Sequence, residues 1–284
     1  MTTSNHKLFT TVHGELCVDT VADGKMVRSL ERGLYPNQSL LDFAKKCITK
    51  ESVVIDIGAH IGTFAVPVSK FAGLTIAFEP AEKTLALLRQ NIERNHASVS
   101  VRAVGLGSAP GSASLLERKA ENAGANTLVE GSDIPVTTLD SEIEKANFIK
   151  IDVEGMEAEV LAGGKKLLEH SQPVVWFEVN LSQLRSHGTS PARLEGFFHS
   201  LGYELYFLLD ENKLARVKTL SLLTACIAPG SWLLSGESAP FDIIAIAKGK
   251  ILPLPCVGFS SALSFALGTN LQVNLGRIKK AISP

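Results

Sequence analysis

The sequence predicts a doubly wound α/β domain with a mostly parallel sheet and helices on both of its faces. Two observations carry this prediction. Short runs of β-forming residues alternate with amphipathic segments along the chain, which is typical of βαβ units. One of these runs, residues 52–57, is almost continuously apolar and ends at Gly58, as expected of a strand that is buried on both faces.

The expected elements follow one another in a regular order. A helix over residues 39–50 leads into the strand at 52–57, because its apolar residues recur at helical spacing. Further helices are expected at residues 80–95, 155–169 and 192–201. Further strands are expected at residues 74–78, 99–106, 111–116, 134–139, 148–151, 174–179, 203–209 and 241–247, and the sheet is expected to end in an antiparallel closing strand.

The length of 284 residues fits one elaborated domain. We expect a lead-in segment (1–50), the main domain (51–250) and a C-terminal extension without an assigned role (251–284). Hydrophobic residues make up 45% of the chain, charged residues 20%, and the formal net charge is −1. Binding to nucleic acid requires a clustered basic excess, so we expect a small-molecule partner and no nucleic acid. Self-association into a homo-oligomer is left open.

Neither a membrane span nor an oxidising compartment is indicated. Residues 1–10 lack the apolar core of a signal peptide. The apolar stretch at 220–234 is interrupted by Pro229 and Gly230, and it is too short to cross a bilayer. The chain has no C-x-x-C pair, which excludes a zinc ribbon and a dithiol redox site. Reduced cysteines suit the cytoplasm, where we expect this protein.

A glycine-rich motif follows the strand at 52–57 and predicts a cofactor site. It reads Asp56-Ile-Gly58-Ala59-His60-Ile-Gly62 and differs from the G-x-G-x-x-G spacing of dinucleotide sites. Asp56 is badly placed for a pyrophosphate, because two negative charges would meet. It suits a ligand with a cationic amino group, such as S-adenosylmethionine (SAM), which carries an ammonium and a sulfonium.

Two further strand ends complete the expected cofactor site. Glu79 and Pro80 end the strand at 74–78, and a carboxylate about twenty residues past the glycine loop commonly accepts both hydroxyls of a ribose. Val104 lies near the end of the strand at 99–106, where apolar packing against an adenine is expected. The competing explanation for Asp56 and Glu79 is that they only cap helices.

The strands at 148–151 and 174–179 end in candidate catalytic residues. Asp152, Glu178 and Asn180 are expected to converge where a methyl acceptor meets the donor, with Asp152 and Glu178 as the bases. These side chains are also hard oxygen ligands, so a Mg²⁺ site formed by the same three residues is left open. His60 and His187 are alternative bases. Glu157 and Glu159 are expected on the solvated face of the following helix.

At these motifs the sequence resembles the FkbM-type methyltransferases. The matching stretches are residues 33–36 (GLYP), 53–62 (VVIDIGAHIG), 77–80 (AFEP), 136–140 (VTTLD) and 148–164 (FIKIDVEGMEAEVLAGG). The resemblance implies a class I SAM-methyltransferase (Rossmann-like) fold and transfer of a methyl group to a hydroxyl oxygen of a small molecule or sugar. It also implies that Asp56, Gly58 and Gly62 hold the methionine part of SAM and Glu79 the ribose.

One residue departs from a regular fold of this kind. Pro67 falls within the helix expected after Gly62, where it should shorten or kink that helix. Two other function classes compete with methyl transfer. A nicotinamide-dependent oxidoreductase is disfavoured by the glycine spacing and by Asp56. A non-catalytic interaction protein on the same fold is disfavoured by the intact run of polar residues from Asp152 to Asn180.

Overall fold

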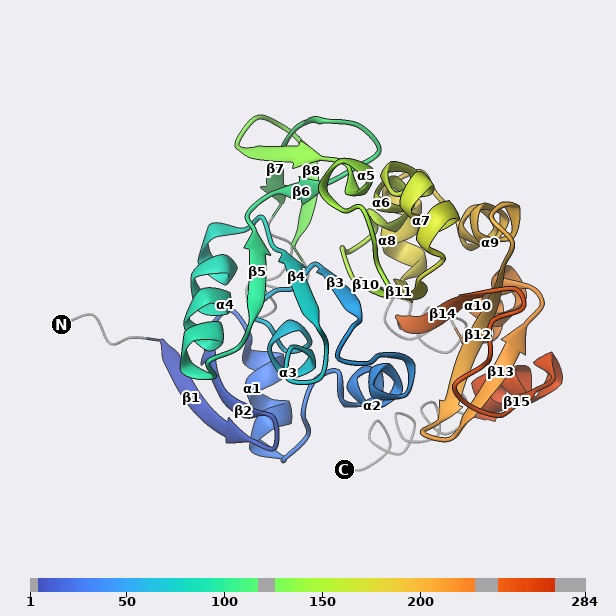
Figure 1. Ribbon diagram of the computed structural model, residues 1–284, viewed down its shortest axis with the longest axis horizontal. Helices are drawn as coiled ribbons and strands as arrows, with labels where there is room; N and C mark the ends of the chain where they lie inside the picture. The colour runs from blue at the N-terminus through green and yellow to red at the C-terminus, as the bar shows by residue number, and fades with distance from the viewer. Residues whose placement is uncertain (1–4, 117–125, 228–239, 269–284) are drawn as a thin grey trace, which may run out of the picture. The chain divides into compact units, whose positions relative to one another are not determined.

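The computed structural model describes residues 5–116, 126–227 and 240–268 (Figure 1). The chain divides into two compact units, Met1–Val174 and Val175–Pro284. Among the described residues, no helix is both long and apolar enough to span a bilayer. The two units are described separately below.

The first unit is built on parallel strands. β3 (Val53–Ile57), β4 (Leu74–Phe78), β5 (Val99–Arg102) and β10 (Phe148–Ile151) pair in the order β10-β3-β4-β5. β3 and β10 are the buried centre, since Val54, Ile55 and Ile149 are fully buried. Parallel strands that are buried on both faces are apolar almost throughout, which is the pattern that predicted them.

Helices cover this sheet and connect its strands. They are α2 (Gln38–Cys47), α3 (Ala65–Val68), α4 (Glu82–Arg94), α5 (Leu139–Glu142), α6 (Glu157–Gly163) and α7 (Lys165–Ser171). The helix after Gly62 has only four residues and contains Pro67, in agreement with the predicted shortening. The predicted helix 155–169 is divided into α6 and α7 at Gly164, whose φ of −114° and ψ of 14° are not helical. A Cβ at Gly164 would meet Leu139 Cδ2 at 2.7 Å, so this position requires glycine.

The predicted strand 99–106 is wrong in one respect: it is two strands in two different sheets. β5 ends at Arg102, and β6 (Gly105–Leu106) joins a small second sheet with β7 (Gly111–Leu116), β8 (Thr127–Glu130) and β9 (Ile134–Thr137). The order in this sheet is β6-β9-β7-β8. Residues 117–125, which connect β7 to β8 in the sequence, lie outside the described residues.

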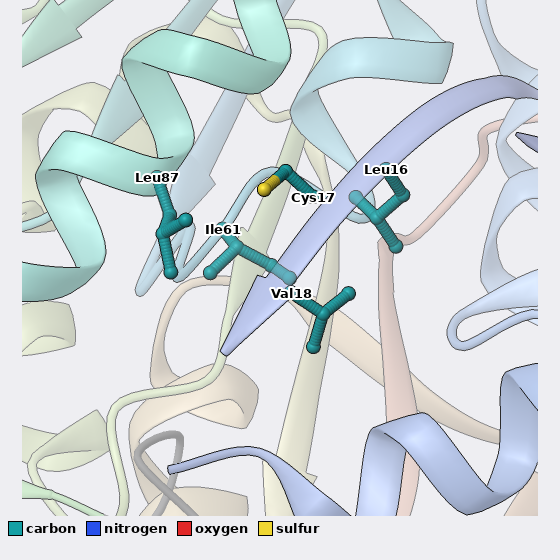
Figure 2. Close-up of a cluster of buried hydrophobic side chains, with 5 residues drawn as sticks. All are labelled: Leu16, Cys17, Val18, Ile61 and Leu87. Carbon is teal, nitrogen blue, oxygen red and sulfur yellow. The ribbon is translucent and has the colours of Figure 1, made fainter. Parts of the chain in front are cut away.

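The N-terminal segment adds elements that the sequence did not predict. β1 (His6–Thr11) and β2 (Gly14–Asp19) form an antiparallel hairpin, and α1 (Gly24–Glu31) follows. Side chains of β2 form a buried cluster with Ile61 of the glycine loop and Leu87 of α4 (Figure 2). The hairpin is therefore packed onto the predicted cofactor loop.

The second unit is mainly antiparallel. β11 (Val174–Val179), β12 (Tyr203–Asp210), β13 (Lys213–Val217), β14 (Phe241–Ala247) and β15 (Cys256–Val257) follow the order β15-β13-β12-β14-β11. β14 runs antiparallel to both β11 and β12, which confirms the predicted antiparallel closing strand. The helices are α8 (Leu181–Ser186), α9 (Pro191–Ser200) and α10 (Leu220–Ile227), with Phe177 stacked on Phe198 in the core.

Candidate functional site

The glycine loop leaves the end of β3 in a conformation that few residues adopt. Gly58, His60 and Gly62 have positive φ values of 74°, 52° and 90°. Gly58 lies against the backbone of Asp152, and a Cβ at this position would meet the Asp152 carbonyl oxygen at 1.9 Å. Only glycine fits this contact, which brings the end of β3 next to the end of β10.

Asp56 lies behind this loop rather than on its surface. Its side chain is fully buried, and its Oδ2 accepts the Ala65 N–H at 3.0 Å. Its Oδ1 is 3.1 Å from the Lys150 ammonium. Asp56 therefore does not reach a ligand that binds in front of the loop. It can act on such a ligand only indirectly, by holding the backbone and Lys150 in place.

Lys150 is the residue of this site that sequence reasoning missed. It lies in β10 directly opposite Asp56, donates to the Gly58 carbonyl at 2.7 Å and is 3.5 Å from Asp152 Oδ2. Burial would lower the pKa of Lys150, but the charges of Asp56 and Asp152 outweigh burial and raise it. The sequence did contain a sign of this role: Lys150 is a charged residue inside an otherwise apolar strand. A buried charge requires a partner of opposite charge.

Glu79 occupies the end of β4, as predicted, and is 7% exposed. Its Oε2 accepts the His60 N–H at 2.8 Å, and its Oε1 accepts the Ala81 N–H at 2.9 Å. Burial raises the pKa of Glu79, while the His60 charge and these N–H donors oppose that rise. The carboxylate is thus fixed in orientation at the edge of the parallel sheet where ligands bind in such folds.

The remaining predicted cofactor residues surround the same strand ends. Ala59 is buried, and its N–H donates to the Phe78 carbonyl at 3.0 Å. Pro80 is half-buried and precedes α4, which begins at Glu82, so the prediction that Pro80 lies in the first helical turn is wrong. Val104 is half-buried in the link between β5 and β6.

His60 directs its side chain toward the N-terminal segment. Its Nε2 is 3.2 Å from Oδ1 of Asp23, which is 2% exposed. Burial would lower the pKa of His60, but the hydrogen bond and charge of Asp23, with the charge of Glu79, raise it. His60 therefore faces Asp23 with its imidazole and Glu79 with its backbone N–H.

Asp152, the predicted catalytic base, follows the end of β10. The side chain of Asp152 is 40% exposed, and its N–H donates to the Ile57 carbonyl at 3.1 Å. The prediction for Glu157 is wrong: its side chain is buried rather than solvated, and it accepts the Gly155 N–H at 3.2 Å. Glu157 belongs to the first turn of α6, where its carboxylate faces the protein interior.

Glu178 and Asn180 belong to the second unit. Glu178 is half-buried in β11, opposite Asp242 of β14. Asn180 is the N-cap of α8, and its Oδ1 accepts from the Ser182 hydroxyl at 2.9 Å and from the Gln183 N–H. The Asn180 oxygen predicted as a metal ligand is therefore used to begin a helix.

Comparisons with known proteins identify the family of this chain. A model of the methyltransferase FkbM domain matches residues 56–205. The hexuronic acid methyltransferase AglP of Haloferax volcanii is 29% identical over 145 residues, which are 49% of this chain and 60% of that protein. The chain thus spans less than two thirds of this curated relative.

Two solved structures are also similar. Methyltransferase FkbM from Methylobacillus flagellatus KT shares 19% identity over 46% of this chain and 33% of that chain, with a TM-score of 0.36. The complex of M. jannaschii TYW2 with AdoMet shares 14% identity over 86% of each chain, with a TM-score of 0.45. The family model covers more than half of the sequence, from the start of the glycine motif to β12, and the chain therefore belongs to the FkbM methyltransferase family.

Proposed function

We propose that this protein transfers the methyl group of SAM to a hydroxyl oxygen of a small molecule or sugar. The observation that carries the proposal is the arrangement of three strand ends within the first unit. Asp56 and Lys150 fix the glycine loop from behind, Glu79 stands fixed at the end of β4, and Asp152 is accessible at the end of β10. Membership of the methyltransferase family supports the same chemistry.

The residues present fit SAM better than they fit a dinucleotide. The Glu79 carboxylate accepts the Ala81 N–H and the Thr84 hydroxyl at Oε1 and the His60 N–H at Oε2, and Oε2 keeps a lone pair with which to accept a ribose hydroxyl. Gly58 allows the loop to lie against the Asp152 backbone, which places the proposed base beside the loop. Asp152, which is accessible beside the loop, would place a negative charge next to a pyrophosphate bound there.

Bound SAM would supply an electrophilic methyl group, and the protein would supply position and a base. Asp152 is the proposed base, because its side chain is accessible and lies beside the glycine loop that would hold the donor. It accepts the proton of the attacking hydroxyl, while Lys150 keeps the carboxylate in place. Glu178 is the second candidate, at the end of β11.

The proposed acceptor class is a sugar, on the strength of a relative that is named as a hexuronic acid methyltransferase. The Mg²⁺ site that the sequence leaves open fits these residues poorly. A divalent cation on Asp152 would lie next to the Lys150 ammonium, and Asn180 already uses its oxygen as a helix cap. We therefore derive no catalytic step through a metal.

Titration calorimetry with S-adenosylhomocysteine (SAH), SAM and NAD tests the proposal. We expect SAM and SAH to bind and NAD not to bind. The acceptor class is then tested by mass spectrometry of a panel of sugars and uronic acids incubated with SAM, in which one member should gain a single methyl group. Binding of NAD without binding of SAM or SAH would refute the proposed function.

A further inference from the structure

The N-terminal segment is joined to the glycine loop by contacts of several kinds. Leu16, Cys17 and Val18 of β2 pack in one buried cluster with Ile61 of the loop, as Figure 2 shows. Asn91 of α4 adds polar links, because its amide group donates to the Cys17 carbonyl at 3.1 Å and to the Ile61 carbonyl at 2.9 Å. The loop therefore depends on a segment that precedes the matched residues 56–205.

Asp23 makes the charged contact between this segment and the loop. It follows β2, and its backbone N–H donates to the Asp19 carbonyl at 2.9 Å, which fixes the turn into α1. Its Oδ1 is 3.2 Å from His60 Nε2, and the Asp23 side chain is 2% exposed. A carboxylate that is so deeply buried is unfavourable unless a cation faces it.

The backbone of His60 gives this contact a functional consequence. His60 has a φ of 52°, in the left-handed region that costs energy for most side chains, and its N–H donates to Glu79 Oε2 at 2.8 Å. Asp23 holds the side chain of His60, and the backbone N–H of His60 orients Glu79, the proposed ribose-binding carboxylate. Loss of this contact would release both the strained backbone and the Glu79 carboxylate.

We propose that Asp23 is a positioning residue of the SAM site, which it acts on through His60. The inference rests on the proposed function and extends it to a residue outside the matched family region. It also predicts a pH dependence. The carboxylates of Asp23 and Glu79 favour the charged imidazole, while burial and the more distant Lys150 oppose it. When His60 loses its proton, the loop loses its charged contact and SAH binding weakens.

The test is calorimetric titration with SAH, which lacks the sulfonium charge and so reports on the loop rather than on attraction of a cation. The wild type should bind SAH about tenfold more weakly once the pH passes the His60 pKa, because the contact between two charged groups is then lost. In Asp23→Asn the charged contact is absent at every pH, so the variant should bind SAH about as weakly as the wild type does at high pH, and the fall should not occur. In His60→Asn it should be absent, since asparagine tolerates positive φ and does not titrate.

Glu93→Gln is the matched control, because Glu93 is an exposed acid on α4. It should keep the wild-type pH profile. A merely structural role of Asp23 would leave Asp23→Asn weaker than the wild type by the same factor at every pH, high pH included, and that result would overturn the inference. An unchanged profile in His60→Asn would overturn it too, even if Asp23→Asn fails to fold. A wild type that binds no SAH at any pH would instead refute the proposed function, and this inference with it.

Discussion

The Lys150 ammonium is 3.1 Å from Oδ1 of Asp56, and the two residues face each other across the paired strands β10 and β3. Asp56 is fully buried and Lys150 is 4% exposed, so this ion pair lies inside the sheet. Breaking such a pair by removing one partner costs about 3–5 kcal/mol, because the other charge is left uncompensated. Lys150→Met should therefore lower the free energy of unfolding by about that amount, measured by urea denaturation.

The control for this prediction is the double variant Lys150→Met with Asp56→Asn. It removes both charges, so most of the lost free energy of unfolding should return. The double variant should still bind SAH more weakly than the wild type, because Lys150 also donates to the Gly58 carbonyl of the loop. If the single and double variants unfold at the same urea concentration, the two charges are not coupled and our account of the loop is wrong.

Asp152→Asn should lose turnover while keeping cofactor binding. The substitution retains the shape of the side chain and removes the proposed base, which should lower kcat by about 10²–10⁴-fold. Because Asp152 is 40% exposed, its loss should change the melting temperature little. The measurement is a methyl-transfer assay on the identified acceptor, with SAH calorimetry alongside. Near-full activity of Asp152→Asn would show that the catalytic centre lies elsewhere.

Methyl transfer should be insensitive to chelation. Lys150 is 3.5 Å from Oδ2 of Asp152, so a divalent cation on this carboxylate would lie next to another positive charge. Turnover after dialysis against EDTA should equal that of the untreated protein, and added Mg²⁺ or Mn²⁺ should not raise it. Activity that falls with EDTA and returns with Mg²⁺ would reinstate a metal site at these residues.

The parallel core of the first unit and one of its key residues could be predicted from the sequence. β3, β4 and β10 are short apolar runs followed by polar residues, and burial on both faces requires that pattern. The position of Glu79 follows from the same reasoning, since a strand end in a parallel sheet fixes where its next residue stands.

Other features depend on partners that are distant in the sequence. From the sequence alone, Asp56 is interpreted as a ligand-binding acid. The structure shows that Lys150, 94 positions later, lies opposite it. Asp23 carries no motif, and only the packing of β2 on Ile61 brings it to His60. Glu157 was misjudged because helical spacing does not tell which neighbouring element covers a helix face.

Glu79→Ala should weaken SAM binding by about 1.5–3 kcal/mol, the scale of lost hydrogen bonds to a charged group. The variant should also bind 5′-methylthioadenosine more weakly than the wild type does, because this ligand keeps the ribose and lacks the amino-acid part. Glu82→Ala is the matched control, since Glu82 is an exposed acid three residues later, in the first turn of α4. Calorimetry in which both variants bind as tightly as the wild type would remove Glu79 from the cofactor site.

Glu157→Gln should stabilise the protein at neutral pH. Burial, with a smaller effect from the charge of Asp152, raises the pKa of Glu157 from an ordinary value of 4.5 to about 7. Below the ordinary value the side chain is neutral in both the folded and the unfolded chain, and burial carries no electrostatic cost. As the pH rises from there through the folded-state pKa, the unfolded chain releases its proton while the folded chain retains it, and the free energy of unfolding falls.

Glutamine keeps an acceptor for the Gly155 N–H and does not titrate, so the variant escapes this loss. The advantage of Glu157→Gln over the wild type should therefore grow between about pH 4.5 and pH 7 toward about 3 kcal/mol and then level off. Urea denaturation across this range measures it, with the exposed Glu93→Gln as a control that should show no such growth. A constant difference at every pH would mean that Glu157 keeps an ordinary pKa in the folded protein.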